Sequence, residues 1–242
     1  MRPLQPWPAS LDDRWQGVDM DAWLSTVRSF ASDARLAEFF GEQRPLWDRV
    51  DATMAAFVQA HGADAPQWLH EFSGTAIAQT VLVQGLLTER GNYGPHVVLP
   101  DGRKTAYQII VNWHPDEDGV PRPQPDLAVF YIHELAHSYM NPLVERHASI
   151  LQASAQALYD RHAAAMEAVG YGEWYSVACE SLVRAATRTY LHDDPEAAAG
   201  ADENDRLQGF AWVPEVAAVL EPPLDETDMT AVAQVLARHG AP

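Results

Sequence analysis

Hydrophobic side chains recur at helical spacing through the first third of the chain. This pattern predicts a helix over residues 20–40, with Asp19 as its N-cap and Gly41 as its stop. A second helix is expected over residues 45–62, with a proline in its first turn, where a missing N–H costs little. A third, short helix is expected over residues 66–72. The N-terminal part of the chain is therefore predicted to be helical.

The pattern changes after Ser73-Gly74. Segments rich in β-branched and aromatic residues predict strands at 80–87 and 105–113, with a shorter strand at 96–99. Glycine-containing turns separate these strands, which favours a β meander. A loop rich in Pro, Asp and Gly follows, over residues 112–126.

Helical periodicity then continues to the C-terminus. Pro142 is expected to end the first of these helices at Asn141, and residues 193–205 are expected to form an exposed acidic loop. The predicted helices cover residues 127–140, 142–169, 175–191, 212–220 and 228–238. The prediction is one mainly helical α+β domain over 1–242, with helices in 1–72, a small mixed or antiparallel sheet in 73–125 and helices in 126–242.

Composition narrows the possible functions of a chain of 242 residues. Its net charge of −18 repels phosphates, which argues against nucleic-acid partners. The single cysteine, Cys179, cannot form an internal disulfide, so any metal site must use histidines and carboxylates. No apolar run reaches the length of about 18 residues that spans a bilayer, so we expect no transmembrane segment.

The N-terminus leaves the compartment open. Residues 1–10 contain three prolines and no apolar stretch, so the chain as given shows no signal peptide. A soluble protein is expected. It is periplasmic or secreted if a leader was trimmed, and otherwise cytoplasmic.

The candidate chemistry lies in the segment FYIHELAHSYMNP, where His133, Glu134 and His137 form an H-E-x-x-H motif. Two histidines four residues apart lie one turn apart on one helix face, so both imidazoles can reach one zinc ion. Glu134 points to a neighbouring position, where it can act as a general base on water. Apolar neighbours such as Ile132 and Leu135 favour a buried helix, whereas two histidines that merely pack are the alternative.

A catalytic zinc ion normally takes a third protein ligand. Leu143 stands where a metzincin would place a third histidine, so a later glutamate is the remaining common solution. Glu180 lies in a predicted helix among apolar residues, where its charge needs a partner. That partner is zinc or, alternatively, Arg184 one turn on. The weaker candidates are Glu145, Glu173, Glu167 and Asp160.

The segments HELAHSYMNP, ESLVRA and GFAWVPEV together resemble a bacterial family of uncharacterised zincin-like proteins that is known only as a domain of unknown function. The pattern of their motif residues resembles that of the gluzincin branch of metallopeptidases. The resemblance covers about the C-terminal two thirds of the chain. It implies His133, His137 and Glu180 as zinc ligands and Glu134 as the base. It also implies that an edge strand lies over the cleft and pairs with an extended substrate, for which residues 105–113 are the candidate.

Further candidates surround these residues. An oxyanion donor besides zinc is expected near the cleft. Tyr175 is our choice for this role, and Tyr190 and His192 are alternatives, although each is more typical of core or interface packing. Trp113 is a candidate for the cleft wall. By contrast, His70, His96 and His114 have no partner at metal-ligand spacing.

The sequence thus predicts a zinc metallopeptidase that acts on a peptide or protein substrate through a zinc-activated water. Two alternatives stay open. One is a metallohydrolase acting on a non-peptide amide, because the same machinery activates water for any carbonyl. The other is a non-enzymatic module that contains zinc and binds a partner, which would need a closed four-ligand site.

Overall fold

The computed structural model describes residues 7, 15–86, 88, 91–111, 114–124 and 127–241. The chain divides into two compact units, Met1–Val50 and Asp51–Pro242. The single domain expected over residues 1–242 stays a prediction.

The first unit contains α1 (Met20–Asp33), α2 (Leu36–Glu42) and the beginning of α3 (Arg44–His61). The side chain of Asp19 accepts hydrogen bonds from the backbone N–H groups of Asp21 and Ala22, which confirms the predicted N-cap. The prediction of a single helix over residues 20–40 is wrong. Arg35 adopts a left-handed conformation with φ of 49°, which separates α1 from α2 without a glycine or proline to signal the break.

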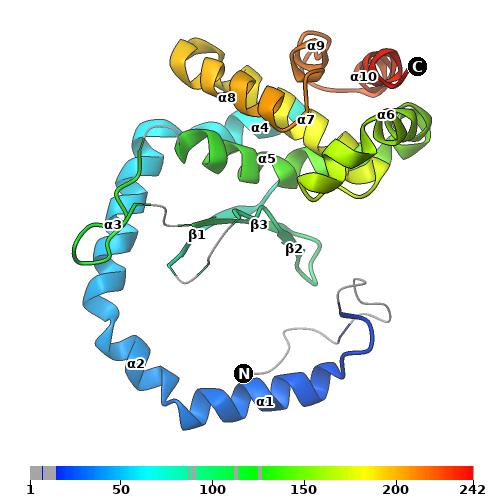
Figure 1. The fold of residues 1–242 in the computed structure, drawn as a ribbon. Coiled ribbons are helices and arrows are strands. Elements are labelled where there is room, and N and C mark those ends of the chain that lie inside the picture. Colours follow the sequence, from blue (N-terminus) through cyan, green and yellow to red (C-terminus); the bar gives the residue numbers. More distant parts are fainter. Residues whose placement is uncertain are drawn as a thin grey trace. The chain divides into compact units, whose positions relative to one another are not determined.

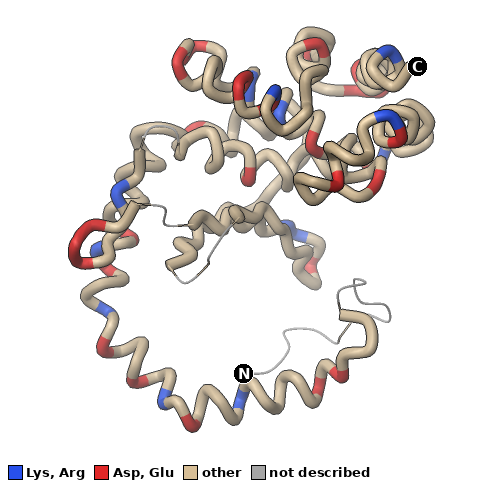
Figure 2. Tube along the Cα trace, in the orientation of Figure 1, with Lys and Arg blue, Asp and Glu red and all other residues tan. Residues whose placement is uncertain are grey.

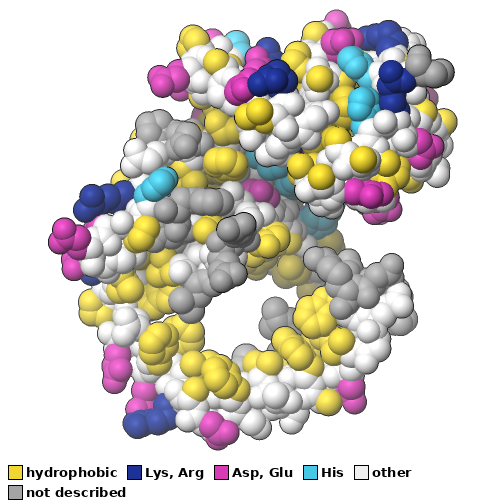
Figure 3. All heavy atoms as spheres, in the orientation of Figure 1, with side chains coloured by type: hydrophobic (Ala, Val, Ile, Leu, Met, Phe, Trp, Pro, Cys, Tyr) yellow, Lys and Arg dark blue, Asp and Glu magenta, His cyan; other side chains and the backbone are white. Residues whose placement is uncertain are grey.

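The first unit has little core of its own. Among its described residues, only Leu24 and Val50 are buried. Apolar side chains are visible along α1 and α2 in Figure 3. The exposed aromatic residues described in α1, α2 and the segment before them are Trp7, Trp15, Trp23, Phe30, Phe39 and Phe40. Burial among the described residues of this unit therefore contributes little to the stability of these helices.

The second unit is mainly helical with one small sheet. Its elements are the rest of α3, α4 (Ala65–Ser73), β1 (Gln79–Gly85), β2 (His96–Val98), β3 (Lys104–Val111), α5 (Leu127–Arg146), α6 (Ala148–Ala168), α7 (Trp174–Tyr190), the 3-10 helix η2 (Leu191–Asp193), α8 (Pro195–Leu207), α9 (Val213–Ala217) and α10 (Glu226–Gly240). The predicted α+β class with a small mixed sheet is confirmed.

The order of the strands is β1-β3-β2, so the predicted meander is wrong. β3 pairs in parallel with β1 and antiparallel with β2. It is therefore the central strand, and the expectation that residues 105–113 form the edge is also wrong. Among the described strands, one edge of the sheet is instead formed by residues 93–98, because Tyr93 bridges to Ile109 in the register that β2 continues.

Helix α5 passes through Pro142 and ends at Arg146, so the expected end at Asn141 is wrong. Proline removes one helical hydrogen bond and crowds the preceding turn. Leu143 and Val144 directly after it are almost fully buried. Their burial in the core offsets the cost of the proline and keeps the helix continuous.

Residues 195–207 form α8, which corrects the prediction of an acidic loop over 193–205. The Asp194 side chain caps the helix by accepting a hydrogen bond from the N–H of Ala197, and Pro195 occupies the first turn. The run of alanines that follows has high helix propensity. These local signals outweigh the polar composition of the segment.

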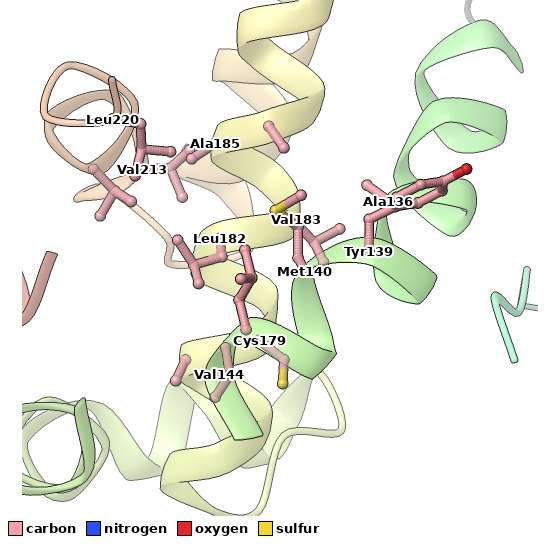
Figure 4. Packing of buried hydrophobic residues seen from close by; sticks show 14 of the residues in the cluster. Ala136, Tyr139, Met140, Val144, Cys179, Leu182, Val183, Ala185, Val213 and Leu220 are labelled. Atoms are coloured by element: carbon pink, nitrogen blue, oxygen red, sulfur yellow. The ribbon is translucent and has the colours of Figure 1, made fainter. Parts of the chain in front are cut away.

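The core of the second unit forms where α5 packs against α7 (Figure 4). Met140 and Val144 of α5 belong to one apolar cluster with Leu182 and Val183 of α7. Each of the four is almost completely buried. The other side of α5 contacts β3, while α6 and α9 contact α7 (Figure 1). Helix α5 therefore lies between the sheet and a helical layer.

Charge is distributed along the chain and not confined to one element. Acidic residues occur in most helices and connecting segments, and basic residues are interspersed among them (Figure 2). Among the described helices, none has both the length and the apolar character needed to cross a membrane.

The edge segment 93–98 approaches α5 closely at Gly94. A side-chain carbon added at Gly94 would overlap the carbonyl oxygen of Glu134. Only a residue without a side chain allows the edge segment to approach the helix this closely. Gly94 thus fixes the distance between the sheet edge and the H-E-x-x-H motif.

We predict that Gly94→Ala lowers the free energy of unfolding by about 1–3 kcal/mol, because the added methyl group must push the edge segment away from α5. The measurement is urea unfolding followed by circular dichroism. Gly200→Ala is the control, since Gly200 lies in α8 with open space around it. This variant should be neutral or more stable by up to about 1 kcal/mol. Equal stability of Gly94→Ala and the wild type would contradict the close contact.

Candidate metal centre

Helix α5 holds the three motif residues close together in the second unit. The ring centroids of His133 and His137 lie 4.9 Å apart, as expected for histidines separated by one helical turn. Glu134 is buried, with 8% of its surface exposed. The apolar residues that surround the motif, such as Ile132 and Leu135, are fully buried and hold the helix in the core.

Helix α7 brings Glu180 to this histidine pair. The Oε1 atom of Glu180 lies 3.3 Å from Nε2 of His137, and Oε2 lies 3.5 Å from Nε2 of His133. One possible ligand atom from each of the three residues lies within 4.8 Å of the others. These three side chains could hold a metal ion, which is the cluster that the sequence predicted.

Asn141 supports the second histidine of the motif. Its Oδ1 atom lies 3.3 Å from Nδ1 of His137. When Nδ1 carries the proton and donates it to this oxygen, Nε2 has its lone pair free on the side of Glu180. Because α5 continues through Pro142, Asn141 is a helical residue four positions after His137, and it faces the same side of the helix.

Burial sets the protonation of the cluster. It lowers the pKa of His133 to about 3, so this imidazole is neutral at pH 7. It raises the pKa of Glu134 to about 7. Burial acts to raise the pKa of Glu180, but the two histidines and Arg184 outweigh it and hold this pKa below its usual value. The result is a negative Glu180 opposite a neutral His133, which are the charge states that metal binding requires of these two residues. Burial acts to lower the pKa of His137, but its contact with Glu180 outweighs burial and raises this pKa, so a metal ion must displace a proton there.

Arg184 contacts Glu180 as well. Its Nε donates a hydrogen bond of 3.0 Å to Oε2 of Glu180, and its NH1 group donates one of 2.7 Å to Asp205 of α8. All three side chains are buried. Glu180 therefore takes both of its alternative roles at once. It belongs to the possible metal-ligand group, and it is an ion-pair partner of Arg184.

A cavity of about 260 Å³ adjoins the motif. His133 and Glu134 form part of its wall, together with Tyr171 and residues of α7 and α8. Gly91 and Asn92, which precede the sheet edge, line it as well. A second hollow, of about 900 Å³, shares three lining residues with it, namely Val129, Phe130 and Asn204. The space beside Glu134 can thus receive a ligand.

The predicted oxyanion donors do not gather in this cavity. Tyr175 is not part of its wall, and its hydroxyl interacts with Cys179 one turn further along α7. The Tyr190 hydroxyl donates to Asp64 beside the larger hollow, and His192 is exposed. Trp113, expected at the cleft wall, lies outside the described residues.

The weaker ligand candidates lie elsewhere. Glu173 precedes α7 as its N-cap residue, and Glu145 is exposed. Glu167 accepts a hydrogen bond from Tyr159, and Asp160 accepts one from Gln156. Within the described part of the chain, the metal-ligand group comprises His133, His137 and Glu180.

Sequence reasoning missed several residues that the fold brings to the site. Tyr171 belongs to the turn before α7, and its hydroxyl lies 3.5 Å from NH2 of Arg184. Asp205 and Gln208 bind the same guanidinium, and no local pattern signals this contact. Asn141 could have been found from its i+4 spacing to His137, but Pro142 suggested that the helix had already ended there.

A family model for a domain of unknown function, DUF4932, matches residues 10–227. The chain belongs to this family. The match to DUF4932 includes both units and all of the residues that form the metal-ligand group. No curated protein and no solved structure matches this DUF4932 chain significantly.

We predict that the purified protein binds one divalent metal ion per chain and that His137→Ala abolishes this binding, because the variant removes one of three ligands. Elemental analysis after dialysis against a zinc salt measures the metal content. His114→Ala is the matched control, since His114 is an exposed loop residue. Loss of metal from both variants, or from neither, would contradict this assignment of the site.

Proposed function

We propose that this protein is a zinc-dependent hydrolase of the gluzincin type that cleaves peptide bonds. The observation that carries the proposal is the meeting of His133, His137 and Glu180 beside a cavity that Glu134 also lines. The H-E-x-x-H motif and the later glutamate give the same ligand set as that branch of metallopeptidases.

The donor set fits zinc. Two imidazole nitrogens and one carboxylate oxygen are ligands that zinc accepts, and catalytic zinc sites keep three protein ligands and one open position. The lowered pKa of His133 keeps its nitrogen free of a proton. The negative charge of Glu180 offsets part of the charge of a divalent ion.

The residues around the site can activate water. A zinc ion bound here would lower the pKa of a water molecule and polarise a substrate carbonyl. Glu134 lines the cavity, and burial raises its pKa to about 7. A carboxylate with this pKa can accept a proton from water and then pass it to the leaving amine. Glu134 is therefore the general base and general acid in our proposal.

Tyr171 replaces Tyr175 as our candidate for the oxyanion donor. Tyr171 lines the cavity together with His133 and Glu134. Burial raises the pKa of its phenol well above the usual value, so the hydroxyl keeps its proton and can donate a hydrogen bond. A fixed donor beside the reacting carbonyl stabilises the charge that develops on its oxygen.

The surroundings of the site favour a peptide over a small substrate. The cavity beside Glu134 adjoins the larger hollow, which gives space for several residues. Gly91 and Asn92, which precede the edge segment 93–98, line the cavity wall. Main-chain groups at such an edge can pair with an extended peptide. In our proposal this segment takes the part that was expected of residues 105–113.

We predict that Glu134→Gln lowers the rate of peptide hydrolysis by about 10²–10⁴-fold, because the amide cannot accept the proton from water. Zinc content should not change, since Glu134 is not one of the three ligands. Cleavage of a peptide library, followed by mass spectrometry, measures the rate. Glu145→Gln provides a control on an exposed position of the same helix. A wild-type rate in the Glu134 variant would refute the proposed mechanism.

We predict that Tyr171→Phe lowers kcat by about 10²–10³-fold with little change in KM, because the lost hydrogen bond acts mainly on the transition state. Tyr175→Phe should retain the wild-type kcat, since Tyr175 does not line the cavity. Steady-state kinetics of the two variants on one peptide substrate compare them directly. The opposite ranking would return the donor role to Tyr175.

A further inference from the structure

Arg184 is held from several sides at once. Besides Glu180 and Asp205, its NH2 group donates a hydrogen bond of 2.7 Å to Oε1 of Gln208. The guanidinium carbon also lies 4.3 Å from the centre of the Phe210 ring. Only 5% of the Arg184 surface is exposed. A buried guanidinium with this many partners has one orientation available to it.

The partners of Arg184 are themselves fixed. The amide of Gln208 donates to Oδ1 of Asn204, which sets the direction of its carbonyl oxygen. Phe210 is fully buried and packs against Trp212, whose indole N–H donates to Ser181 on α7. The segment Gly209–Trp212 therefore supports the part of α7 that carries Glu180, which gives the GFAW sequence a structural role.

Arg184 distinguishes the two oxygens of Glu180. Its Nε binds Oε2, while Oε1 lies nearest to Nε2 of His137. A carboxylate that accepts a hydrogen bond from a guanidinium on one oxygen has the other oxygen available for a different cation. The orientation of Glu180 about its side-chain bonds is then set by Arg184 before any ion arrives.

We propose that Arg184 is a positioning residue that holds Oε2 of Glu180 and leaves Oε1 as the atom offered to the metal ion. The inference rests on the proposed metal site. It adds that the affinity of this site depends on the Arg184 network, which we define as Arg184 with Asp205, Gln208 and Phe210. Groups that orient a metal ligand typically contribute a factor of about 10–100 in metal affinity.

The planar fork of arginine is essential to this role. Its separate nitrogens reach Glu180 and Asp205 at the same time, whereas the ammonium group of lysine is a single point of charge on a flexible chain. Lysine at position 184 keeps the charge but cannot hold both carboxylates in these positions.

The experiment compares the zinc affinity of Arg184→Lys with that of the wild type, by competition with a chromophoric chelator. Arg188→Lys is the matched control, because Arg188 lies one turn along α7 and also pairs with an acid of α8, Asp202, but has no contact with Glu180. We expect the dissociation constant for zinc to rise about 10–100-fold in Arg184→Lys and to stay within about twofold of wild type in Arg188→Lys. Circular dichroism at the temperature of the titration checks that each variant is folded.

Asp205→Asn is the second variant. It leaves Arg184 and Glu180 in place and removes one of the two carboxylates that hold the guanidinium. It should weaken zinc binding in the same direction, which keeps the inference testable if Arg184→Lys does not fold. The absorption spectrum of the cobalt-loaded protein gives a readout of the ligand arrangement, and it should change in both variants but not in Arg188→Lys.

The outcomes separate the two proposals. A wild-type protein that binds no zinc would overturn the proposed function itself. Zinc binding in the wild type with unchanged affinity in Arg184→Lys, or in Asp205→Asn if the lysine variant is unfolded, would overturn only the role of Arg184. An equal loss of affinity in Arg184→Lys and Arg188→Lys would also overturn it, because the effect would then follow from weaker packing between α7 and α8.

Discussion

The candidate site depends on one buried carboxylate. Glu180 is 5% exposed, and its negative charge is maintained by Arg184 on one side and by two histidines on the other. A carboxylate in this position without partners would take up a proton or destabilise the fold. The cations and polar groups that surround it are therefore required by its charge. They come from α5 and α7, and Asp205 of α8 binds the Arg184 guanidinium from its other side.

The packing of α5 makes this arrangement possible. The helix is buried between β3 and α7, so its motif residues have little freedom to move. One apolar cluster, which includes buried residues of both α5 and α7, fixes the distance between the helix with the histidines and the helix with the glutamate. Close packing of this kind resists small displacements, which suits a site whose ligand atoms must meet within a few ångströms. Hydrophobic burial thus sets the relative position of α5 and α7, and this position brings the ligand atoms of the histidines and the glutamate together.

Local pattern was enough to predict much of this structure. Helical periodicity predicted α3, α4 and the start of α5, and the motif together with the apolar neighbours of Glu180 identified the three residues that come together. Prediction failed where contacts between residues far apart in the sequence determine the structure. The position of β3 between β1 and β2 depends on pairing between separate segments, and the passage of α5 through Pro142 depends on the burial of Leu143 and Val144. Tyr171 and Asp205 were missed for the same reason, because only tertiary packing brings them to the site.

The attachment of α8 has a further consequence for how the cavity is reached. Among the described residues of this helix, only Ala201 and Asp205 are buried, and its contacts with α7 include the pairs formed by Arg184 and Arg188. Little buried apolar surface therefore becomes exposed if α8 detaches from α7. The free energy of this local opening should be far below that of global unfolding. Amide hydrogens of α8 would exchange with solvent while those of α5 and α7 stay protected. Because α8 forms part of the cavity wall, such local opening would widen the entrance to the cavity.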